Sequence, residues 1–356
     1  MSGDGSQFTL FTEGDELFAQ MLRDIDIAQR TVSFEVYIFK DDRIGGQFID
    51  ALVTAAKRGL DVRLRLDAFG SLGKISNKSL TLFRQAGVKL QWHRRWDWLH
   101  PFTYGRRNHR KLLVIDEDVA YLGGFNIGEE SSGASVGPSR WRDTHLRVTG
   151  LPARRAAELY RDFIGNRDCG QEVWSGDSLL LPNYDVGCRY RWRCILQHQL
   201  RRASQRIWVT TPYFVPDTAT QRELRTAAER GVDVKLLVPG KSDVPIAQWA
   251  ARLSYDSLLR AGVKIYEYEE RILHAKTILI DADWSSVGTS NLDYRSLFIN
   301  DELNLITHSS GLNSNLAYIF SDDLVHARLV PRVLSPDVSP LRLLQGVVGW
   351  VCRKWL

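Results

Sequence analysis

Two short segments of this chain carry the same polar residues at the same spacing. Each has a histidine, a lysine two positions later, an aspartate five positions after the lysine and an asparagine ten positions after the aspartate. The first set is His109, Lys111, Asp116 and Asn126, and the second is His274, Lys276, Asp281 and Asn291. A single His-x-Lys carries little information, but two copies with identical internal spacing predict one active site to which both contribute.

An imidazole, an ammonium group and a carboxamide around one centre suit the chemistry of a phosphodiester. One imidazole can attack phosphorus and form a phosphohistidine, while the other protonates the departing alcohol and then deprotonates the incoming one. Lys111 and Lys276 would stabilise the charged phosphoryl oxygens. We therefore predict phosphoryl transfer at a site shared by the two segments, with no metal ion and no cofactor.

The aspartates of the two motifs are expected to support the site rather than to react. The sequences KLLVID and KTILID predict strands, and side chains two positions apart on a strand share a face. Each histidine therefore projects together with its lysine. Asp116 and Asp281 each lie seven positions from the histidine, so they point to the opposite face. We keep both in the catalytic motif as its structural supports.

A glycine-containing step follows the next strand in each half and leads to the asparagine. Glycine lets the backbone come close to an anion, and the asparagine adds an amide donor. The predicted phosphate-binding residues are Gly124, Asn126, Thr289 and Asn291. Each imidazole also needs a carboxylate that fixes its tautomer and orientation. The candidates are Asp143 in WRDTHLRV and Glu302 in INDELNL, each near the start of a predicted strand.

The motifs belong to a longer internal repeat. Three earlier elements recur in the same order in both halves. They are TVSFEVYIFKDD (31–42) with RIWVTTPYFVPD (206–217), AAKRGLDVRLRL (55–66) with AAERGVDVKLLV (227–238), and AGVKL (86–90) with AGVKI (261–265). Four similar elements in one order, counting the motif itself, indicate a duplicated unit.

Each half is predicted to run strand, helix, strand, helix, strand, strand. Alternating strands and helices favour an α/β fold with mostly parallel sheets flanked by helices, here as two pseudo-symmetric halves with one shared active site. The predicted halves are residues 1–165 and 170–330, joined by a connector rich in Gly, Asp and Asn over 165–187. Residues 331–356 form a third, C-terminal segment.

Composition limits the remaining possibilities. Hydrophobic residues make up 44% and charged residues 25% of the 356 residues, which is typical of a folded protein. A net charge of +5 favours an anionic partner such as nucleic acid or an acidic membrane surface. The four cysteines form no C-x-x-C pair, which predicts a reducing compartment and no structural metal. The sequence contains no uninterrupted run of 18 apolar residues, so no membrane-spanning helix is predicted.

At these residues the chain resembles the phospholipase D superfamily, and its flanking segments are similar to bacterial cardiolipin synthases. The similar segments are RRNHRKLLVID (106–116), YLGGFNIGEE (121–130), WRDTH (141–145), TPYFVPD (211–217) and VGTSNLDYRSLFINDE (287–302). The resemblance covers about residues 8–330. It implies transfer of a phosphatidyl group to phosphatidylglycerol through a phosphohistidine, with release of an alcohol. It also implies that His109 is the nucleophile and His274 the acid and base. Thr289 replaces the family's usual serine and keeps its hydroxyl.

The resemblance also implies where the protein works. Longer cardiolipin synthases begin with two membrane-spanning helices, whereas this sequence resembles the shorter, peripheral type. We expect a protein on the cytoplasmic face of the bacterial inner membrane, with anionic phospholipids and the membrane surface as partners. Nucleic acid is not expected to be a partner, and the sequence leaves the oligomeric state open.

Two segments bear on the choice of substrate. Residues 92–107, WHRRWDWLHPFTYGRR, mix aromatic side chains with arginines, which suits a lipid headgroup layer or the bases and phosphates of a nucleic acid. Residues 339–356, SPLRLLQGVVGWVCRKWL, have apolar residues at helical spacing with Trp and basic residues, which favours an interfacial helix. The alternative for this tail is a helix docked on the body of the protein or on a second copy.

Two other functions are alternatives to phosphatidyl transfer. A hydrolytic phospholipase D or a nuclease of the same superfamily would employ the same residues with water as acceptor. An inert lipid-binding or nucleic-acid-binding relative would be expected to have lost a catalytic histidine or lysine. All four are present in this sequence, which favours an enzyme.

Overall fold

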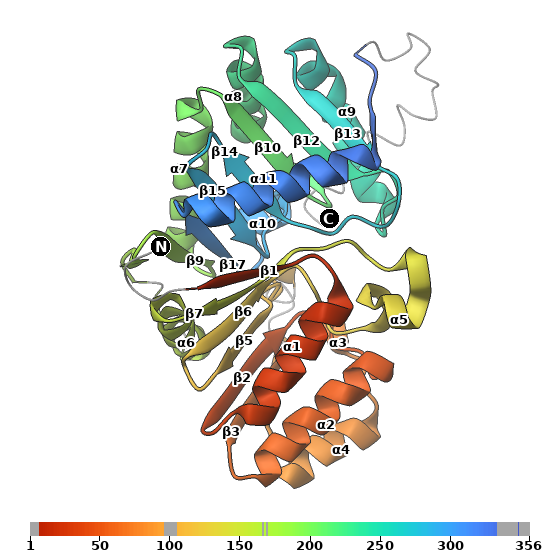
Figure 1. The fold of residues 1–356 in the computed structure, drawn as a ribbon, viewed down its shortest axis with the longest axis vertical. Helices are drawn as coiled ribbons and strands as arrows, with labels where there is room; N and C mark the ends of the chain where they lie inside the picture. The colour runs from red at the N-terminus through yellow and green to blue at the C-terminus, as the bar shows by residue number, and fades with distance from the viewer. Residues whose placement is uncertain (1–6, 96–104, 166, 169, 333–347, 349–356) are drawn as a thin grey trace. The chain divides into compact units, whose positions relative to one another are not determined.

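The computed structural model describes residues 7–95, 105–165, 167–168, 170–332 and 348 (Figure 1). The chain divides into two compact units. The first comprises Met1–Asp185, Val287–Thr289 and Asn300–Leu305, and the second comprises Val186–Ser286, Ser290–Ile299 and Ile306–Leu356. The first unit thus extends beyond the predicted end at residue 165, and it takes up two short segments from the second half of the sequence.

A seven-stranded sheet forms the first unit. Its order is β1 (Phe8–Phe11), β7 (His145–Thr149), β6 (Val119–Gly123), β5 (Leu112–Ile115), β2 (Thr31–Val36), β3 (Asp61–Asp67) and β4 (Lys89–His93). Only the pairings β2–β3 and β3–β4 are parallel, and the other pairings are antiparallel. The prediction of mostly parallel sheets was therefore wrong. Helices connect β2, β3 and β4, whereas a tight turn at residues 116–118 joins β5 to β6 and makes that pair antiparallel.

Helices and short turns complete the first unit. They are α1 (Gly14–Ile27), α2 (Arg43–Lys57), α3 (Ala68–Ser71), α4 (Asn77–Ala86), the 3-10 turns Glu129–Ser131 and Gly137–Ser139, α5 (Gly133–Val136) and α6 (Leu151–Ile164). The hairpin β8 (Trp174–Ser175) and β9 (Ser178–Asn183) follows. Figure 1 shows α1, α2 and α4 side by side, and α6 belongs to the part of the unit near β6 and β7.

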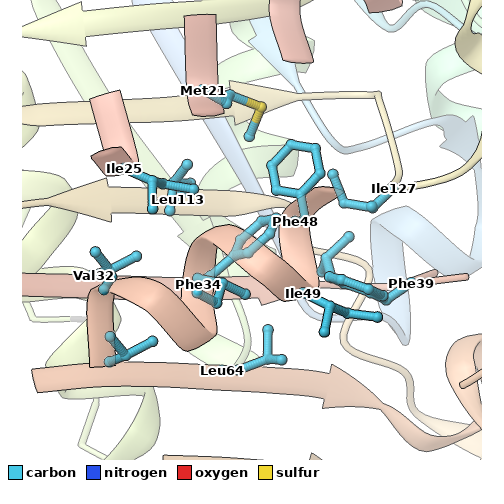
Figure 2. Packing of buried hydrophobic residues seen from close by; sticks show 14 of the residues in the cluster. Met21, Ile25, Val32, Phe34, Phe39, Phe48, Ile49, Leu64, Leu113 and Ile127 are labelled. Atoms are coloured by element: carbon cyan, nitrogen blue, oxygen red, sulfur yellow. The ribbon is translucent and has the colours of Figure 1, made fainter. Parts of the chain in front are cut away.

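The main core of the first unit lies between the sheet and the helices α1 and α2. Phe34 of β2 packs against Phe48 of α2 at a ring-centroid distance of 6.1 Å, and Phe18 of α1 meets Phe48 edge-on at 5.8 Å (Figure 2). Removing such a ring from a core costs about 3–5 kcal/mol. Because side chains alternate along a strand, the neighbours Glu35 of β2 and Arg65 of β3 point to the opposite face of the sheet. This opposite face is polar, and it meets Phe163 of α6.

The second unit repeats the central strands of the first. Its strands follow the order β18 (Ala327–Leu329), β13 (Lys264–Tyr268), β12 (Asp233–Pro239), β10 (Arg206–Thr210), β14 (Thr277–Ile280) and β15 (Trp284–Gly288). β10 lies between a parallel neighbour, β12, and an antiparallel neighbour, β14. β2 of the first unit has the same surroundings, with β3 parallel and β5 antiparallel. The predicted pair of pseudo-symmetric α/β halves is confirmed.

The remaining elements of the second half are helices and short strands. They are α7 (Val186–Arg202), β11 (Phe214–Val215), α8 (Thr218–Glu229), α9 (Pro245–Arg260), β16 (Leu292–Asp293), α10 (Tyr294–Phe298), β17 (Glu302–Thr307) and α11 (Ser310–Val325). Equivalent aspartates cap the first repeated helix of each half. Asp42 accepts a hydrogen bond from the Gly45 N–H at 2.9 Å, and Asp217 accepts one from the Thr220 N–H at 3.2 Å. Such N-caps explain why these helices begin directly after the predicted strands.

Two details of the structure differ from the sequence-based expectations. His109 and Lys111 lie in extended backbone just before β5, not within the strand. Cys188 of α7 is disulfide-bonded, whereas Cys194 is exposed and free. A disulfide is typical of an oxidising compartment, so the cysteines do not support the predicted reducing one. In the described part of the chain, every helix is too short or too polar to span a bilayer.

Candidate active site

The backbone around His109 is held by a segment from far along the sequence that belongs to the same unit. The His109 N–H donates to the carbonyl oxygen of Asp301 at 2.9 Å, and the Asp301 N–H donates to the carbonyl oxygen of Arg107 at 2.8 Å. Asn108 and Asp301 form a bridge of the parallel type. These contacts place Glu302, which follows Asp301, beside the imidazole of His109.

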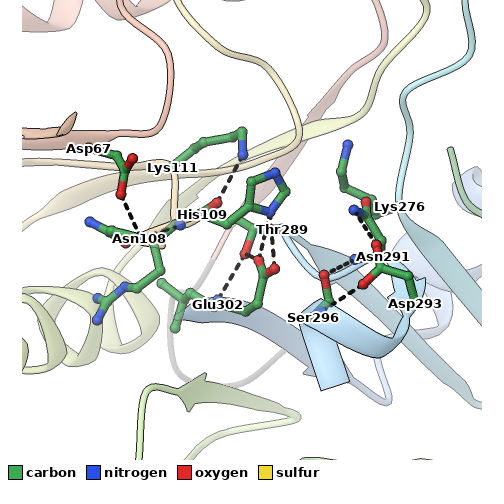
Figure 3. A network of polar contacts seen from close by, with 12 residues as sticks. Asp67, Asn108, His109, Lys111, Lys276, Thr289, Asn291, Asp293, Ser296 and Glu302 are labelled. Atoms are coloured by element: carbon green, nitrogen blue, oxygen red, sulfur yellow. Dashed lines mark hydrogen bonds and ion pairs between the residues drawn. The ribbon is translucent and has the colours of Figure 1, made fainter. Parts of the chain in front are cut away.

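Glu302 contacts the imidazole directly. Nδ1 of His109 lies 3.0 Å from both Oε1 and Oε2 of Glu302 (Figure 3). Both side chains are buried. An ionised carboxylate can only accept hydrogen bonds, so Nδ1 carries the proton in this contact. The lone pair of the neutral ring is then on Nε2, which is the nitrogen that would attack phosphorus.

Thr289 holds the other side of Glu302. Its Oγ1 donates to Oε2 of Glu302 and accepts a hydrogen bond from the Leu303 N–H at 2.9 Å. The N–H of Thr289 in turn donates to the carbonyl oxygen of Leu303 at 3.0 Å. The hydroxyl of Thr289 therefore orients the carboxylate that orients His109.

The two predicted lysines are buried and make the same backbone contact. Nζ of Lys111 donates to the carbonyl oxygen of His109 at 2.9 Å, and Nζ of Lys276 donates to that of His274. Nζ of Lys276 also lies 2.9 Å from Nδ1 of His274. Each ammonium group is thus fixed beside the histidine two positions earlier. In each unit a cation and an imidazole therefore lie side by side, and the predicted role of this pair is to stabilise a phosphoryl group.

The two asparagines are both buried but are held differently. Oδ1 of Asn126 accepts from the Ile38 N–H at 3.1 Å. Nδ2 of Asn291 donates to the Asp293 carboxylate at 3.0 Å, and Asp293 also caps α10 through the Ser296 N–H at 2.7 Å. In both cases a protein contact fixes the carboxamide plane. Phosphate binding by the two asparagines stays a prediction.

Gly124 makes room for a carboxylate. Its N–H donates to the carbonyl oxygen of Thr144 at 2.9 Å, and a Cβ at this position would lie only 1.9 Å from Oδ1 of Asp143. Asp143 directly precedes Thr144, whose carbonyl oxygen accepts the Gly124 N–H. In the same way Glu302 directly precedes Leu303, whose carbonyl oxygen accepts the Thr289 N–H. Asp143 is buried and is the structural equivalent of Glu302. The amide groups of Gly124 and Thr289 are engaged in these contacts, and both residues lie against a carboxylate. Their binding of phosphate stays a prediction.

The two motif aspartates bind the start of a neighbouring strand. The Asp116 carboxylate accepts the backbone N–H groups of Gln29 and Arg30 at 2.7 Å and of Thr31 at 2.8 Å. Asp281 accepts the equivalent N–H groups of residues 204–206 at 2.7–3.2 Å. Burial raises the pKa of each carboxyl, but these hydrogen bonds outweigh it and hold both pKa values below the ordinary value. Their contacts are those of supporting residues.

We expect Asp116→Asn to lower the free energy of unfolding at pH 7 by about 1–3 kcal/mol, because one charged acceptor of three N–H groups is lost. A lowered pKa in the folded state adds stability above the unfolded-state value near 4, and that stability is lost as the pH falls through the folded-state pKa. When the pH falls from 7 to below about 4, the free energy of unfolding should therefore decrease less in the variant than in wild type. Urea unfolding from pH 7 to pH 3 measures both effects. Asp118→Asn, at an exposed neighbouring position, is the control and should change neither.

Sequence reasoning missed the aromatic neighbours of both histidines. The Tyr37 ring meets His109 edge-on at a centroid distance of 5.1 Å, and the Tyr213 ring meets His274 in the same manner at 6.5 Å. Tyr37 directly follows β2, whereas Tyr213 lies three positions after the end of β10. The two tyrosines stand one position apart in the repeat, because Tyr37 matches Pro212, so the available signal was an aromatic residue shortly after the first strand of each half.

Comparison with known proteins agrees with this geometry. A family model described as "Cardiolipin synthase, PLD-like domain" matches residues 21–136 and 196–324. A cardiolipin synthase of Clostridium perfringens is 34% identical over 91% of this chain and 72% of its own length. A cardiolipin synthase 2 of Staphylococcus epidermidis is 33% identical over 95% of this chain and 72% of its own length. The chain belongs to the cardiolipin synthase family. The predicted family and enzyme class, a phosphatidyltransferase, are confirmed.

Solved structures confirm the fold. The phosphatidylserine synthase of Haemophilus influenzae Rd KW20 gives a TM-score of 0.71 at 14% identity and covers 98% of this chain and 92% of its own. A polyphosphate kinase from Porphyromonas gingivalis gives 0.66 at 14% identity, covering 97% of this chain and 52% of its own. At these identities the likeness concerns the arrangement of the elements alone.

Proposed function

We propose that this member of the cardiolipin synthase family joins two phospholipids, with phosphatidylglycerol as acceptor, through a phosphohistidine on His109. Nε2 of His109 attacks phosphorus, the bond to the head-group alcohol breaks, and His274 gives that alcohol its proton. His274 then takes the proton of the acceptor's glycerol hydroxyl, whose oxygen displaces the histidine from phosphorus. The contact that best supports this proposal is that of Glu302 with Nδ1 of His109, because it directs the Nε2 lone pair toward the reaction.

We propose that the two halves serve one reaction, as predicted from the repeat. A double displacement of this kind needs one imidazole that binds phosphorus and one that moves the proton. Each unit supplies one histidine with a buried lysine beside it. Asp143 remains, as predicted, a candidate for a carboxylate that orients an imidazole.

Product analysis tests the proposed reaction. Purified protein is incubated with phosphatidylglycerol liposomes, with and without phosphatidylethanolamine, and the lipids are identified by mass spectrometry. Cardiolipin with released glycerol or ethanolamine is the expected result, and the alcohol identifies the donor lipid. Phosphatidic acid alone would mean that water is the acceptor and would make the protein a hydrolytic phospholipase D. No lipid turnover would contradict the proposal and direct attention to nucleic acid substrates.

We propose that the protein works at the bacterial inner membrane as a peripheral protein, with anionic phospholipids as partners. The relatives act, by their names, in making a membrane lipid. The proposed anchor, residues 339–356, lies outside the described residues apart from residue 348, as does much of the aromatic and arginine-rich segment 92–107. Support for the anchor therefore comes from its sequence, which combines apolar residues at helical spacing with Trp and basic residues.

Deleting residues 339–356 is expected to weaken binding to phosphatidylglycerol liposomes at least about tenfold, because the apolar face and the basic residues of the anchor are lost together. Activity on lipid dispersed in detergent should change little. Liposome co-sedimentation and detergent-based rates measure the two effects, with phosphatidylcholine liposomes as the control surface. Equal losses in both assays would show that the tail serves folding instead.

A further inference from the structure

A polar cavity of about 200 Å³ lies within the first unit, on the face of the sheet opposite to the main core. It is lined by four arginines and three aspartates together with His93, Phe163 and Tyr184. Its lining does not include His109 or Lys111, so it is distinct from the immediate surroundings of the reacting imidazole. A cavity of this size is smaller than a site for a drug-sized molecule and suits a small polar group.

Arg65 of β3 is the residue that most needs a partner in this cavity. Arg65 is only 7% exposed, and its Nε and Nη1 make no hydrogen bond to any residue that the structure describes. The nearby carboxylate of Glu35 is already paired with Arg110, at 2.9 Å. The guanidinium groups of Arg65 and Arg110 lie 4.6 and 4.3 Å from the centre of the Phe163 ring. Two buried cations are therefore close together, and the carboxylate of Glu35 is bonded to only one of them, Arg110.

The excess positive charge of Arg65 and Arg110 over the single carboxylate of Glu35 is unfavourable unless an anion binds there. Burial lowers the pKa of Arg65, and the nearby Glu35 raises it without restoring the ordinary value. A buried cation that lacks a bonded counter-charge destabilises a protein, whereas an anion bound by the planar guanidinium fork would satisfy both charge and hydrogen bonds.

Asp301, one of the three aspartates in the wall of the cavity, makes no hydrogen bond to the unsatisfied Nε and Nη1 of Arg65. Asp301 is bound by Arg106, whose Nε lies 2.7 Å from Oδ1, and it lies 3.3 Å from Nε2 of His93. Its negative charge is therefore already matched by other groups. Among the lining side chains the arginines outnumber the aspartates, which leaves a net positive cavity before His93 is counted.

We propose that this cavity binds a phosphate group, with Arg65 as its principal ligand. The inference rests on the proposed function. A reaction that joins two phospholipids must hold two phosphates, and the histidines and lysines of the catalytic motifs serve only the one that reacts. Asp301, in the cavity wall, directly precedes Glu302 and holds the backbone of His109. A phosphate at Arg65 would thus lie close to the catalytic histidine without reacting. We take the phosphodiester headgroup of the second phospholipid as its source.

Isothermal titration of the full chain with inorganic phosphate tests the site. Wild type is expected to bind at two sites, one in the cavity and one at the catalytic lysines. Arg65→Met should weaken one of them at least about tenfold, and Arg65→Lys, which keeps the charge but loses the fork, should lie between. Arg63→Met is the matched control, because Arg63 lies on the same strand, pairs with Asp61 and does not line the cavity. Circular dichroism confirms that each variant is folded.

A Lys276→Met variant separates this inference from the proposed function. It should lose the other site and keep the one that depends on Arg65. Two unchanged sites in Arg65→Met would overturn the inference. Two unchanged sites in Lys276→Met, with one lost in Arg65→Met, would support the cavity and contradict the catalytic phosphate site.

Competition identifies the source of the phosphate. Phosphatidylglycerol vesicles are expected to displace inorganic phosphate from the Arg65-dependent site of wild type, and Arg65→Met should raise the KM for acceptor lipid at least about tenfold with a smaller change in kcat. Phosphate that stays bound in the presence of vesicles would identify free phosphate as the ligand and would overturn the link to a second lipid.

Discussion

Turnover is expected to fall by at least about 10⁴-fold when either His109 or His274 is replaced by alanine. Alanine at 109 leaves no nitrogen to bind phosphorus, and alanine at 274 leaves the departing alcohol without a proton donor. Initial rates of cardiolipin formation from phosphatidylglycerol in detergent measure the effect. His198→Ala is the matched control, because His198 lies exposed on α7 and outside both motifs, and it should retain full activity.

The size of the loss distinguishes one shared site from two separate ones. If each half carried a complete site of its own, a single histidine variant would keep about half of the activity. If both histidines serve one reaction, each single variant should be as inactive as the double variant, because residues that act as a unit are strongly non-additive. Appreciable activity in either single variant would contradict the shared site.

The covalent intermediate assigns the two roles. Wild type is mixed with labelled phosphatidylglycerol, quenched in alkali, which preserves phosphohistidine, and digested for peptide mapping. The label is expected on the peptide that contains His109, whose Nδ1 is engaged by Glu302. Label on the His274 peptide would reverse the assignment.

The sequence predicts those parts of the site that depend on local spacing. The two lysines bond the carbonyl groups of their own histidines because a fixed two-residue step brings them there in both halves. Asp116 and Asp281 lie just after the strand and bind backbone N–H groups at the start of a neighbouring strand. Their role as structural supports stays a prediction, which these contacts support in both halves.

Contacts between distant segments could be predicted only as candidates. Glu302 was one of two carboxylates proposed for the imidazoles, but its partner is 193 positions away, and nothing local to Glu302 identifies His109. The contacts of Gly124 and Thr289 could not be predicted for the same reason. Each residue packs against a carboxylate from a segment further along the chain: Gly124 leaves space for Asp143, and Thr289 donates a hydrogen bond to Glu302.

The mixed sheets and the cavity at Arg65 could not be predicted from sequence patterns either. Strand direction depends on whether a helix or a tight turn follows, and the turn at Asp116–Asp118 reverses the chain between two strands that were predicted to follow one another without a helix. In DVRLRL the arginines alternate with apolar residues, which is the pattern of a strand with one solvated face. The structure covers that face with Phe163 of α6, and this buries Arg65.

Glu302→Gln is expected to lower kcat by about 10²- to 10⁴-fold with little change in KM. The variant is almost isosteric, so Thr289 can still donate to the remaining oxygen and the packing is kept. A glutamine amide can, however, donate to Nδ1 of His109 as well as accept from it, which permits the tautomer whose Nε2 is protonated and unable to attack. The charge that stabilises the imidazole as it gains a bond to phosphorus is lost at the same time.

The rate of formation of the covalent intermediate separates this role from a merely structural one. In Glu302→Gln the burst of labelled enzyme should slow in proportion to kcat, while thermal unfolding stays close to that of wild type. Glu302→Asp keeps the charge and should recover part of the lost rate. Thr289→Val removes only the hydroxyl that holds the carboxylate, so about a tenfold loss is expected. A normal burst in Glu302→Gln would mean that the carboxylate acts after the phosphohistidine has formed, because the step that depends on the Nε2 lone pair would then be intact.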